Sequence, residues 1–156
     1  FGDLKNPRPV VAAIERARAD GPLLTTGALA DAVRPTLNPR REKKELAQVF
    51  QALRIEVNGE MDALRLFLEQ TASVLRPGGR LCIITYHSLE DRMVKNFMRT
   101  GNVAGEAQKD FFGVTRSPWR MITRQPIEPS EEEVERNPRS RSAKLRIAEL
   151  IDKPGQ

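Results

Sequence analysis

The chain has 156 residues, of which 39% are hydrophobic and 30% charged, and its formal net charge at pH 7 is +5. A chain of this size can bury an ordinary core, and no run of 18 apolar residues occurs, so we expect a cytoplasmic protein with no membrane partner. The single histidine, His87, and the single cysteine, Cys82, exclude an internal disulfide and argue against a zinc site.

The excess positive charge is concentrated in two segments. Residues 34–54 contain six basic and two acidic side chains, and residues 136–146 contain five basic side chains and no acid. Clusters of this kind are typical of proteins that bind a phosphate backbone, although solvated basic faces also occur in proteins that never contact nucleic acid.

The first 75 residues predict helices. Pro9 can begin a helix over residues 10–19, and a second short helix is expected over residues 28–33. Residues 40–75 place apolar side chains at helical spacing, and Asn58-Gly59 predicts a break into two helices.

Residues 81–86 form the apolar run around which the fold is expected to be organised. The run is continuous rather than alternating, so we predict an interior strand that is covered on both faces and buries Cys82. Ser88 is expected to cap the following helix, with Asp91 three residues later. Because open α/β sheets bind ligands at the carboxyl ends of their strands, His87, Ser88 and Asp91 are predicted to lie together there.

The remaining segments predict a long loop and two further strands. Residues 100–117 contain Phe111-Phe112 and are expected to form the loop, and residues 119–126 a strand. Ser130 with Glu133 has the spacing of a capping box at the start of a short helix. The alternating residues 142–151 predict a closing strand that pairs with the strand near Met121.

Several segments together resemble one bacterial enzyme family. They are TTG (25–27), FQALRIEVN (50–58), LRPGGRL (75–81), YHSLEDRMVKNF (86–97) and PSEEEVERNPRSRSAKLRIAE (129–149). In this order they are similar to the C-terminal half of the 16S ribosomal RNA cytosine-N4 methyltransferase family, RsmH or MraW. Because the chain begins with Phe1 rather than Met, we expect a fragment.

This resemblance implies an α/β fold, with the C-terminal part of a Rossmann-like class I methyltransferase core over residues 42–156. Residues 1–41 would be the back part of a helical insertion that recognises RNA. It also implies S-adenosyl-L-methionine as the cofactor, 16S ribosomal RNA in the small ribosomal subunit as the partner, and the N4 amine of a decoding-region cytidine as the methyl acceptor.

The chain departs from the family's pattern in its cofactor residues. It contains no G-x-G loop and no matching acidic strand end, so the cofactor-binding residues are expected upstream of Phe1, and the fragment alone is expected to be inactive. The family's HPATR-like segment before residue 50 is replaced by REKKELAQV, which leaves the role of its histidine unfilled.

The candidate catalytic residues are His87, Ser88 and Asp91, with helix capping and a structural histidine as the alternatives. The candidate RNA-binding residues are Asn58, Arg54, Arg92, Arg139, Arg141 and Lys144. A noncatalytic RNA-binding or ribosome-associated module is the rival function. A hydrolase that uses His87 is disfavoured because no G-x-S-x-G segment occurs.

Overall fold

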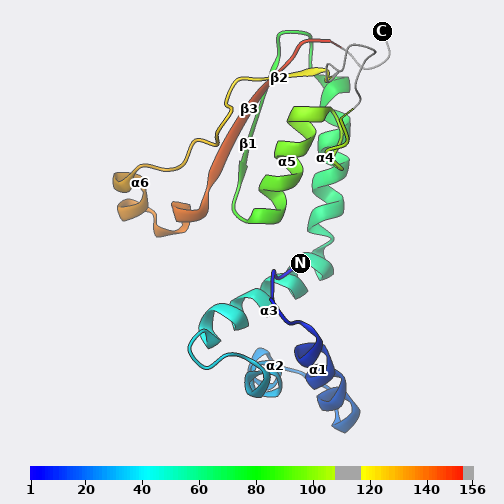
Figure 1. The fold of residues 1–156 in the computed structure, drawn as a ribbon, viewed down its shortest axis with the longest axis vertical. Coiled ribbons are helices and arrows are strands. Elements are labelled where there is room, and N and C mark those ends of the chain that lie inside the picture. Colours follow the sequence, from blue (N-terminus) through cyan, green and yellow to red (C-terminus); the bar gives the residue numbers. More distant parts are fainter. Residues whose placement is uncertain (108–116, 153–156) are drawn as a thin grey trace. The chain divides into compact units, whose positions relative to one another are not determined.

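The computed structural model describes residues 1–107 and 117–152, and the chain forms two compact units, Phe1–Glu60 and Met61–Gln156 (Figure 1). The first unit and its junction contain α1 (Arg8–Asp20), α2 (Thr26–Val33), η1 (Arg34–Thr36), α3 (Glu42–Asn58) and the start of α4 (Glu60–Val74). The second continues with β1 (Arg80–Thr85), α5 (Ser88–Thr100), β2 (Trp119–Met121), α6 (Glu131–Arg136), η2 (Pro138–Ser142) and β3 (Lys144–Leu150).

Helices α1, α2 and α3 of the first unit share a small apolar core. Val10, Val33, Leu37 and Val49 are buried in it. Helix α2 begins where the Thr25 hydroxyl accepts a hydrogen bond from the Ala28 N–H at 3.1 Å, which satisfies one of the free amides of the first turn. The predicted helices over residues 10–19 and 28–33 are confirmed, and so is the break at Asn58-Gly59 between α3 and α4.

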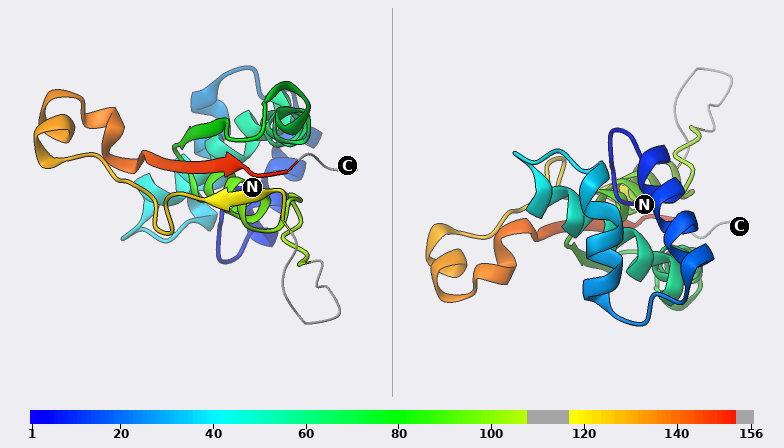
Figure 2. Two further views of the ribbon diagram at one scale, coloured as in Figure 1. Left: turned by 90° about the horizontal axis from the view of Figure 1, so that it is seen from above. Right: turned by 90° about the horizontal axis from the view of Figure 1, so that it is seen from below.

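The second unit contains a three-stranded sheet with the order β1-β3-β2 (Figure 2). Strand β3 is antiparallel to both neighbours, with Leu81 opposite Ala148 and Trp119 opposite Leu150. The predicted pairing of the closing strand with the strand near Met121 is confirmed, although β2 is shorter than expected. The α/β class is confirmed as well, whereas the Rossmann-like core stays a prediction because all pairs in this sheet are antiparallel.

Helices α4 and α5 supply apolar side chains to one face of this sheet. The fully buried residues of the cluster are Leu68, Val94, Met98, Ala148 and Leu150. The rings of Phe97 and Trp119 meet at a centroid distance of 5.6 Å with a 52° tilt. Burial of these side chains is the main stabilising contribution to the second unit.

The opposite face of the sheet corrects one prediction from the sequence. Burial alternates along β1, so this strand is not covered on both faces. Cys82 is exposed rather than buried, and Ile84 is 56% exposed. The continuous apolar run places hydrophobic side chains on both faces, but the helices cover only the face that contains Leu81 and Ile83.

Two further features bear on the predictions. The Ser130 hydroxyl accepts a hydrogen bond from the Glu133 N–H at 3.2 Å, so the predicted start of α6 is confirmed. Phe111-Phe112 lies outside the described residues.

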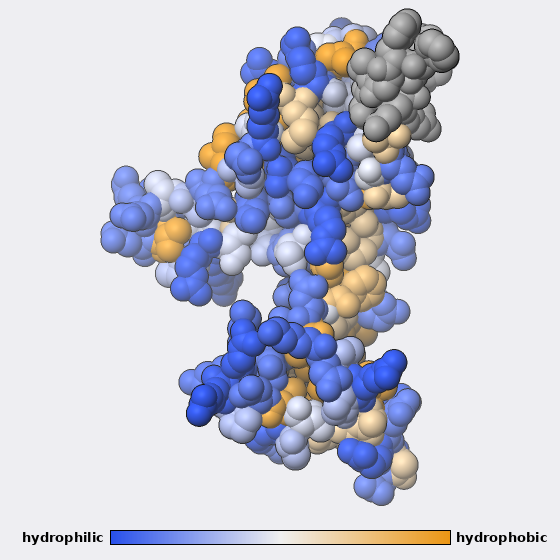
Figure 3. Space-filling view, in the orientation of Figure 1, coloured by the Kyte–Doolittle hydropathy of each residue, from blue (hydrophilic) through white to orange (hydrophobic). Residues whose placement is uncertain are grey.

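Within residues 1–107 and 117–152, no helix is long and apolar enough to cross a membrane. Figure 3 shows hydrophobic residues on the surface over α4. In the same helix, Leu66 and Phe67 are about half exposed.

Gly101 and Gly78 provide a matched test of packing in the second unit. Both have a left-handed φ, +80° and +83°, but a Cβ on Gly101 would lie 2.7 Å from Pro118 Cδ, whereas a Cβ on Gly78 would meet nothing within 4 Å. We expect Gly78→Ala to lower the free energy of unfolding by about 1 kcal/mol through backbone strain, and Gly101→Ala by about 1–3 kcal/mol more. Urea unfolding followed by the fluorescence of Trp119, the chain's one tryptophan, measures both, and equal losses would contradict the assigned clash.

Candidate functional site

The candidate site lies where β1 ends and α5 begins. Strand β1 ends at Thr85, and Tyr86 and His87 connect it to Ser88, the first residue of α5. The structure therefore places His87, Ser88 and Asp91 at the carboxyl end of β1, although their catalytic role stays a prediction. The register brings Lys144 opposite Thr85, so the first residue of β3 lies at the same end.

His87, and not Ser88, is the N-cap of α5, which corrects the predicted cap by one residue. His87 has extended backbone angles, and its Nδ1 accepts a hydrogen bond from the Glu90 N–H at 3.3 Å. Glu90 completes a capping box, since its Oε2 accepts hydrogen bonds from the backbone N–H groups of Tyr86 at 2.9 Å and His87 at 3.3 Å. Ser88 is exposed in the first turn of the helix.

This hydrogen bond determines where a neutral His87 carries its proton. Because Nδ1 accepts from a backbone amide, the proton of the neutral ring is on Nε2. The Nε2 atom is buried and lies 3.4 Å from Glu90 Oε1, without a hydrogen bond in the described part of the chain. In this state His87 is a hydrogen-bond donor at Nε2, while its Nδ1 is engaged as the acceptor of the cap.

Asp91 is held by Arg146 in a bidentate ion pair. Arg146 Nε donates to Asp91 Oδ1 at 2.7 Å, and Nη2 donates to Oδ2 at 3.0 Å. The two side chains are only 5% and 13% exposed, for Arg146 and Asp91. The hydrogen bonds from Arg146 lower the pKa of Asp91 against the opposing effect of burial, and the charges of Lys144 and Lys95 act in the same direction as Arg146.

Glu90 and Arg146 are the important residues of this site that the sequence reasoning missed. Glu90 stands three residues after His87, which is the spacing of a capping box with histidine in place of serine. Arg146 is a charged residue among the inward-facing positions of β3, whose other buried residues are Ala148 and Leu150. A charged residue at an inward position signals a buried partner, because an unpaired buried charge is strongly unfavourable.

A cavity of about 250 Å³ lies beside the end of β1, on the sheet face that α4 and α5 leave uncovered. Its apolar wall includes Ile84, Tyr86 and Leu145, and its polar wall includes Glu133 and Asn137. The hydrogen bond from Arg136 lowers the pKa of Glu133, so its carboxylate is ionised at neutral pH and is already paired with the Arg136 guanidinium. Such a cavity suits a flat neutral ring better than a phosphate group.

The predicted RNA-binding residues of the second unit lie on α5, η2 and the start of β3. Arg139 and Arg141 are exposed on η2, and Lys144 is half-buried at the start of β3. Arg92 is exposed on α5. Within the described chain, Arg92, Arg139 and Arg141 have no carboxylate partner, so their charges are available to a ligand. The described residues contain no group of three acidic, histidine or cysteine side chains that could hold a metal ion.

The sequence of this chain matches a known protein family. The model of the MraW methylase family matches residues 1–151. The chain belongs to the MraW methylase family. It is 57% identical over 149 residues to a Bacteroides thetaiotaomicron protein named ribosomal RNA small subunit methyltransferase H, which covers 96% of this chain and 49% of that relative. Relatives of the same name from Porphyromonas gingivalis strain ATCC 33277 and Azobacteroides pseudotrichonymphae are 54% and 50% identical, each covering 97% of the chain and 50% of the relative.

This MraW-family chain thus spans about half the length of the curated relatives that it matches.

Of its candidate RNA-binding residues, Arg54 and Asn58 belong to the first unit. Both side chains are hydrogen-bonded to Glu60. Arg54 donates two hydrogen bonds to the Glu60 carboxylate, at 2.8 and 3.0 Å, and Asn58 Nδ2 donates one at 3.0 Å. A role of either residue in binding RNA would require them to exchange Glu60 for the ligand.

The ion pair between Asp91 and Arg146 predicts an acid-sensitive stability of the MraW-family chain. Asp91→Asn leaves the Arg146 charge buried without its counterion, and we expect it to lower the free energy of unfolding by about 3 kcal/mol at pH 7. Because the pKa of Asp91 is lowered in the folded state, its contribution is complete above the unfolded pKa of about 4 and is lost as the pH falls through the folded pKa. Urea unfolding between pH 2 and 7 measures both effects.

The matched control is Glu69→Gln, because Glu69 pairs with Arg65 at 3.2 Å on the surface, with both side chains more than a third exposed. Its expected loss is at most about 0.5 kcal/mol. An Asp91→Asn variant as stable as this control, or with the same acid sensitivity as the unaltered chain, would contradict the assigned role.

Proposed function

We propose that this chain is part of an S-adenosylmethionine-dependent methyltransferase that modifies the N4 amine of a cytidine in the 16S ribosomal RNA of the small subunit. The observation that carries the proposal is the family match over residues 1–151, together with relatives named ribosomal RNA small subunit methyltransferase H. The proposed place of action is the cytoplasm, because the relatives of this name are bacterial proteins and bacterial ribosomes lie in the cytoplasm. Arg139 and Arg141, which have no carboxylate partner among the described residues and are close in sequence to Lys144, suit an RNA partner.

The residues at the end of β1 do not by themselves fit S-adenosylmethionine. A nucleoside cofactor needs an acceptor for its ribose hydroxyls and free backbone N–H groups near its charged end. Here Asp91 is paired with Arg146, and Glu90 already accepts the N–H groups of Tyr86 and His87. We therefore assign the main cofactor contacts to the part of the relatives' length that this chain does not span.

The proposed contribution of this chain is to bind and position RNA. Arg139, Arg141 and Lys144 would contact phosphates, and the cavity beside Tyr86 would receive a base that has left its stack. Ser88 is the candidate that could meet the amine with a hydroxyl oxygen, since it is exposed in the first turn of α5. His87 would keep this turn in place through its cap and would donate from Nε2 if that atom became accessible.

The test of the activity compares this chain with a fusion that adds the part of the Bacteroides thetaiotaomicron relative that the chain does not span. Calorimetric titration with S-adenosylmethionine is expected to show binding to the fusion and none to the chain alone. Small ribosomal subunits lacking the modification should gain N4-methylcytidine, detected by mass spectrometry, only with the fusion. Equal cofactor affinity in both proteins would contradict the placement of the cofactor contacts. RNA binding by a fusion without methyl transfer would favour a noncatalytic RNA-binding module.

The basic turn of η2 gives a second prediction. Arg139→Ala with Arg141→Ala, introduced into the fusion, is expected to weaken binding to 16S ribosomal RNA and to reduce the slope of log affinity against log salt by about 1 to 2, because two phosphate contacts are lost. Affinity for S-adenosylmethionine should not change. The matched control is Arg65→Ala with Arg120→Ala, since these guanidinium groups already pair with Glu69 and Glu149. An unchanged salt slope in the first variant would count against the proposed contacts.

A further inference from the structure

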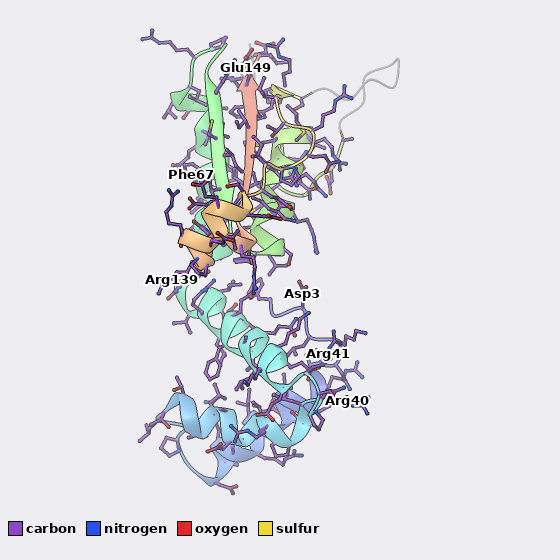
Figure 4. The ribbon with its side chains drawn as sticks, turned by 90° about the vertical axis from the view of Figure 1, so that its left-hand side faces the viewer. Asp3, Arg40, Arg41, Phe67, Arg139 and Glu149 are labelled. Carbon is purple, nitrogen blue, oxygen red and sulfur yellow. The ribbon has the colours of Figure 1, made fainter. Side chains whose placement is uncertain are left out.

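The cavity beside the end of β1 has an amide side chain in its wall to which nothing above assigns a role. This residue is Asn137, which connects α6 to η2. Figures 1 and 4 show these two short helices, orange in both, at the end of the sheet where β1 ends and β3 begins. Asn137 and Glu133 face the cavity from this segment, whereas Ile84, Tyr86 and Leu145 line it from the sheet.

The backbone of Asn137 is held in place by three hydrogen bonds. Its N–H donates to the carbonyl oxygen of Glu133 at 2.7 Å, which ends α6. Its own carbonyl oxygen accepts from the Ser140 N–H at 2.9 Å and from the Ser140 hydroxyl at 2.8 Å. Ser140 is buried, so this anchor lies inside the segment. A residue that is already ordered loses little conformational entropy when it binds a ligand.

Glu133 determines which end of the Asn137 amide is available. The Glu133 carboxylate is ionised, because Arg136 donates a hydrogen bond to its Oε2 and lowers its pKa. An ionised carboxylate only accepts hydrogen bonds, so the amide must turn its Nδ2 toward Glu133, and Nδ2 donates to Glu133 Oε1 at 3.4 Å. The Asn137 Oδ1 atom therefore points away from Glu133, and it accepts no hydrogen bond within the part of the chain that the structure describes.

The composition of the wall favours a ligand that donates hydrogen bonds. Among the described residues, the lining includes the carboxylates of Glu128 and Glu133 and no lysine or arginine. An N–H group of a ligand would meet acceptors here, whereas a carbonyl oxygen would meet other oxygen atoms. The volume of about 250 Å³ is below the roughly 300–1,000 Å³ of sites for whole small molecules, so the cavity has the size for a single base.

We propose that Asn137 is a specificity-determining residue, whose Oδ1 accepts a hydrogen bond from the exocyclic amine of a base while the ring packs against the apolar wall that includes Tyr86. The proposal deepens the proposed function and rests on it for the choice of cytosine over adenine, which also carries such an amine. Uracil is rejected because it has a carbonyl oxygen where cytosine has the amine, so that two acceptors would face each other without a proton. The amine has two N–H groups, so this contact leaves one for another acceptor.

The test uses Tyr86, which is the only tyrosine of the chain, as a reporter in the cavity wall. The 156-residue chain with isotope-labelled tyrosine is titrated with cytidine 5′-monophosphate and with uridine 5′-monophosphate, and the ring signals are followed by NMR. The two ligands share ribose and phosphate, so the contributions of Arg139 and Arg141 cancel in the comparison. The unaltered chain is expected to bind the cytidine nucleotide about fivefold more tightly, which is the value of one hydrogen bond.

Two variants change this preference in different ways. Asn137→Ala removes the acceptor, so the affinity for the cytidine nucleotide should fall about fivefold and the affinity for the uridine nucleotide should not fall. Glu133→Gln lets the Asn137 amide turn, because a glutamine both donates and accepts, so the affinity for the uridine nucleotide should rise. The matched control is Glu132→Gln, which removes the same charge from the neighbouring residue of α6, outside the cavity lining, and should leave the preference unchanged.

Thermal unfolding verifies that each variant is folded, and Glu133→Gln keeps the test decisive if Asn137→Ala is not. Equal affinities of the unaltered chain for the two nucleotides, or no change in the Tyr86 signals with either, would overturn the proposal. An unchanged preference in both Asn137→Ala and Glu133→Gln would overturn it as well. Failure of the proposed function would be seen separately, as an absence of methyl transfer by the fusion although the chain prefers the cytidine nucleotide.

Discussion

The buried ion pair between Asp91 and Arg146 is the constraint on which the second unit depends. It joins the first turn of α5 to the middle of β3 through charge, whereas the other side chains packed between this helix and the sheet in the core cluster are apolar. Because Arg146 lies on the strand that pairs with β1, the same interaction sets the position of α5 relative to the end of β1. The Asp91–Arg146 ion pair therefore helps to position His87, Ser88 and Lys144, although none of these three residues takes part in it.

The architecture around this pair could be predicted from local patterns to a large extent. Helical spacing and Asn58-Gly59 were enough to find α3 and α4, and alternation in residues 142–151 was enough to pair β3 with β2. Long-range pairing was not visible in the same way. Nothing near Asp91 in the sequence points to a partner 55 residues away, so the sequence alone favours a capping or catalytic role for its carboxylate. The sequence pattern places the cap one residue too late, at Ser88, because serine is a common N-cap residue, whereas the structure uses His87.

The distribution of paired and unpaired charge separates two kinds of basic residue in this chain. Arg34, Arg54, Arg65, Arg120 and Arg146 each hold a carboxylate of the chain itself. Those of η2 and of the loop before α3 have none in the described ranges, and both groups stand on short turns next to a proline, Pro138 and Pro39. Counting basic residues in the sequence overestimates the binding surface, because it cannot tell the first kind from the second.

The uncovered face of the sheet has a consequence for how the second unit unfolds. Ile84, Tyr86 and Ile127 are each more than half exposed in the folded state, and Cys82 is exposed beside them. Apolar surface that is already in contact with water does not become newly hydrated on unfolding, so it contributes nothing to the heat-capacity change or to the denaturant dependence of the unfolding free energy. Both quantities should therefore be smaller than the size of this unit would suggest, and they should rise when a protein segment covers that face.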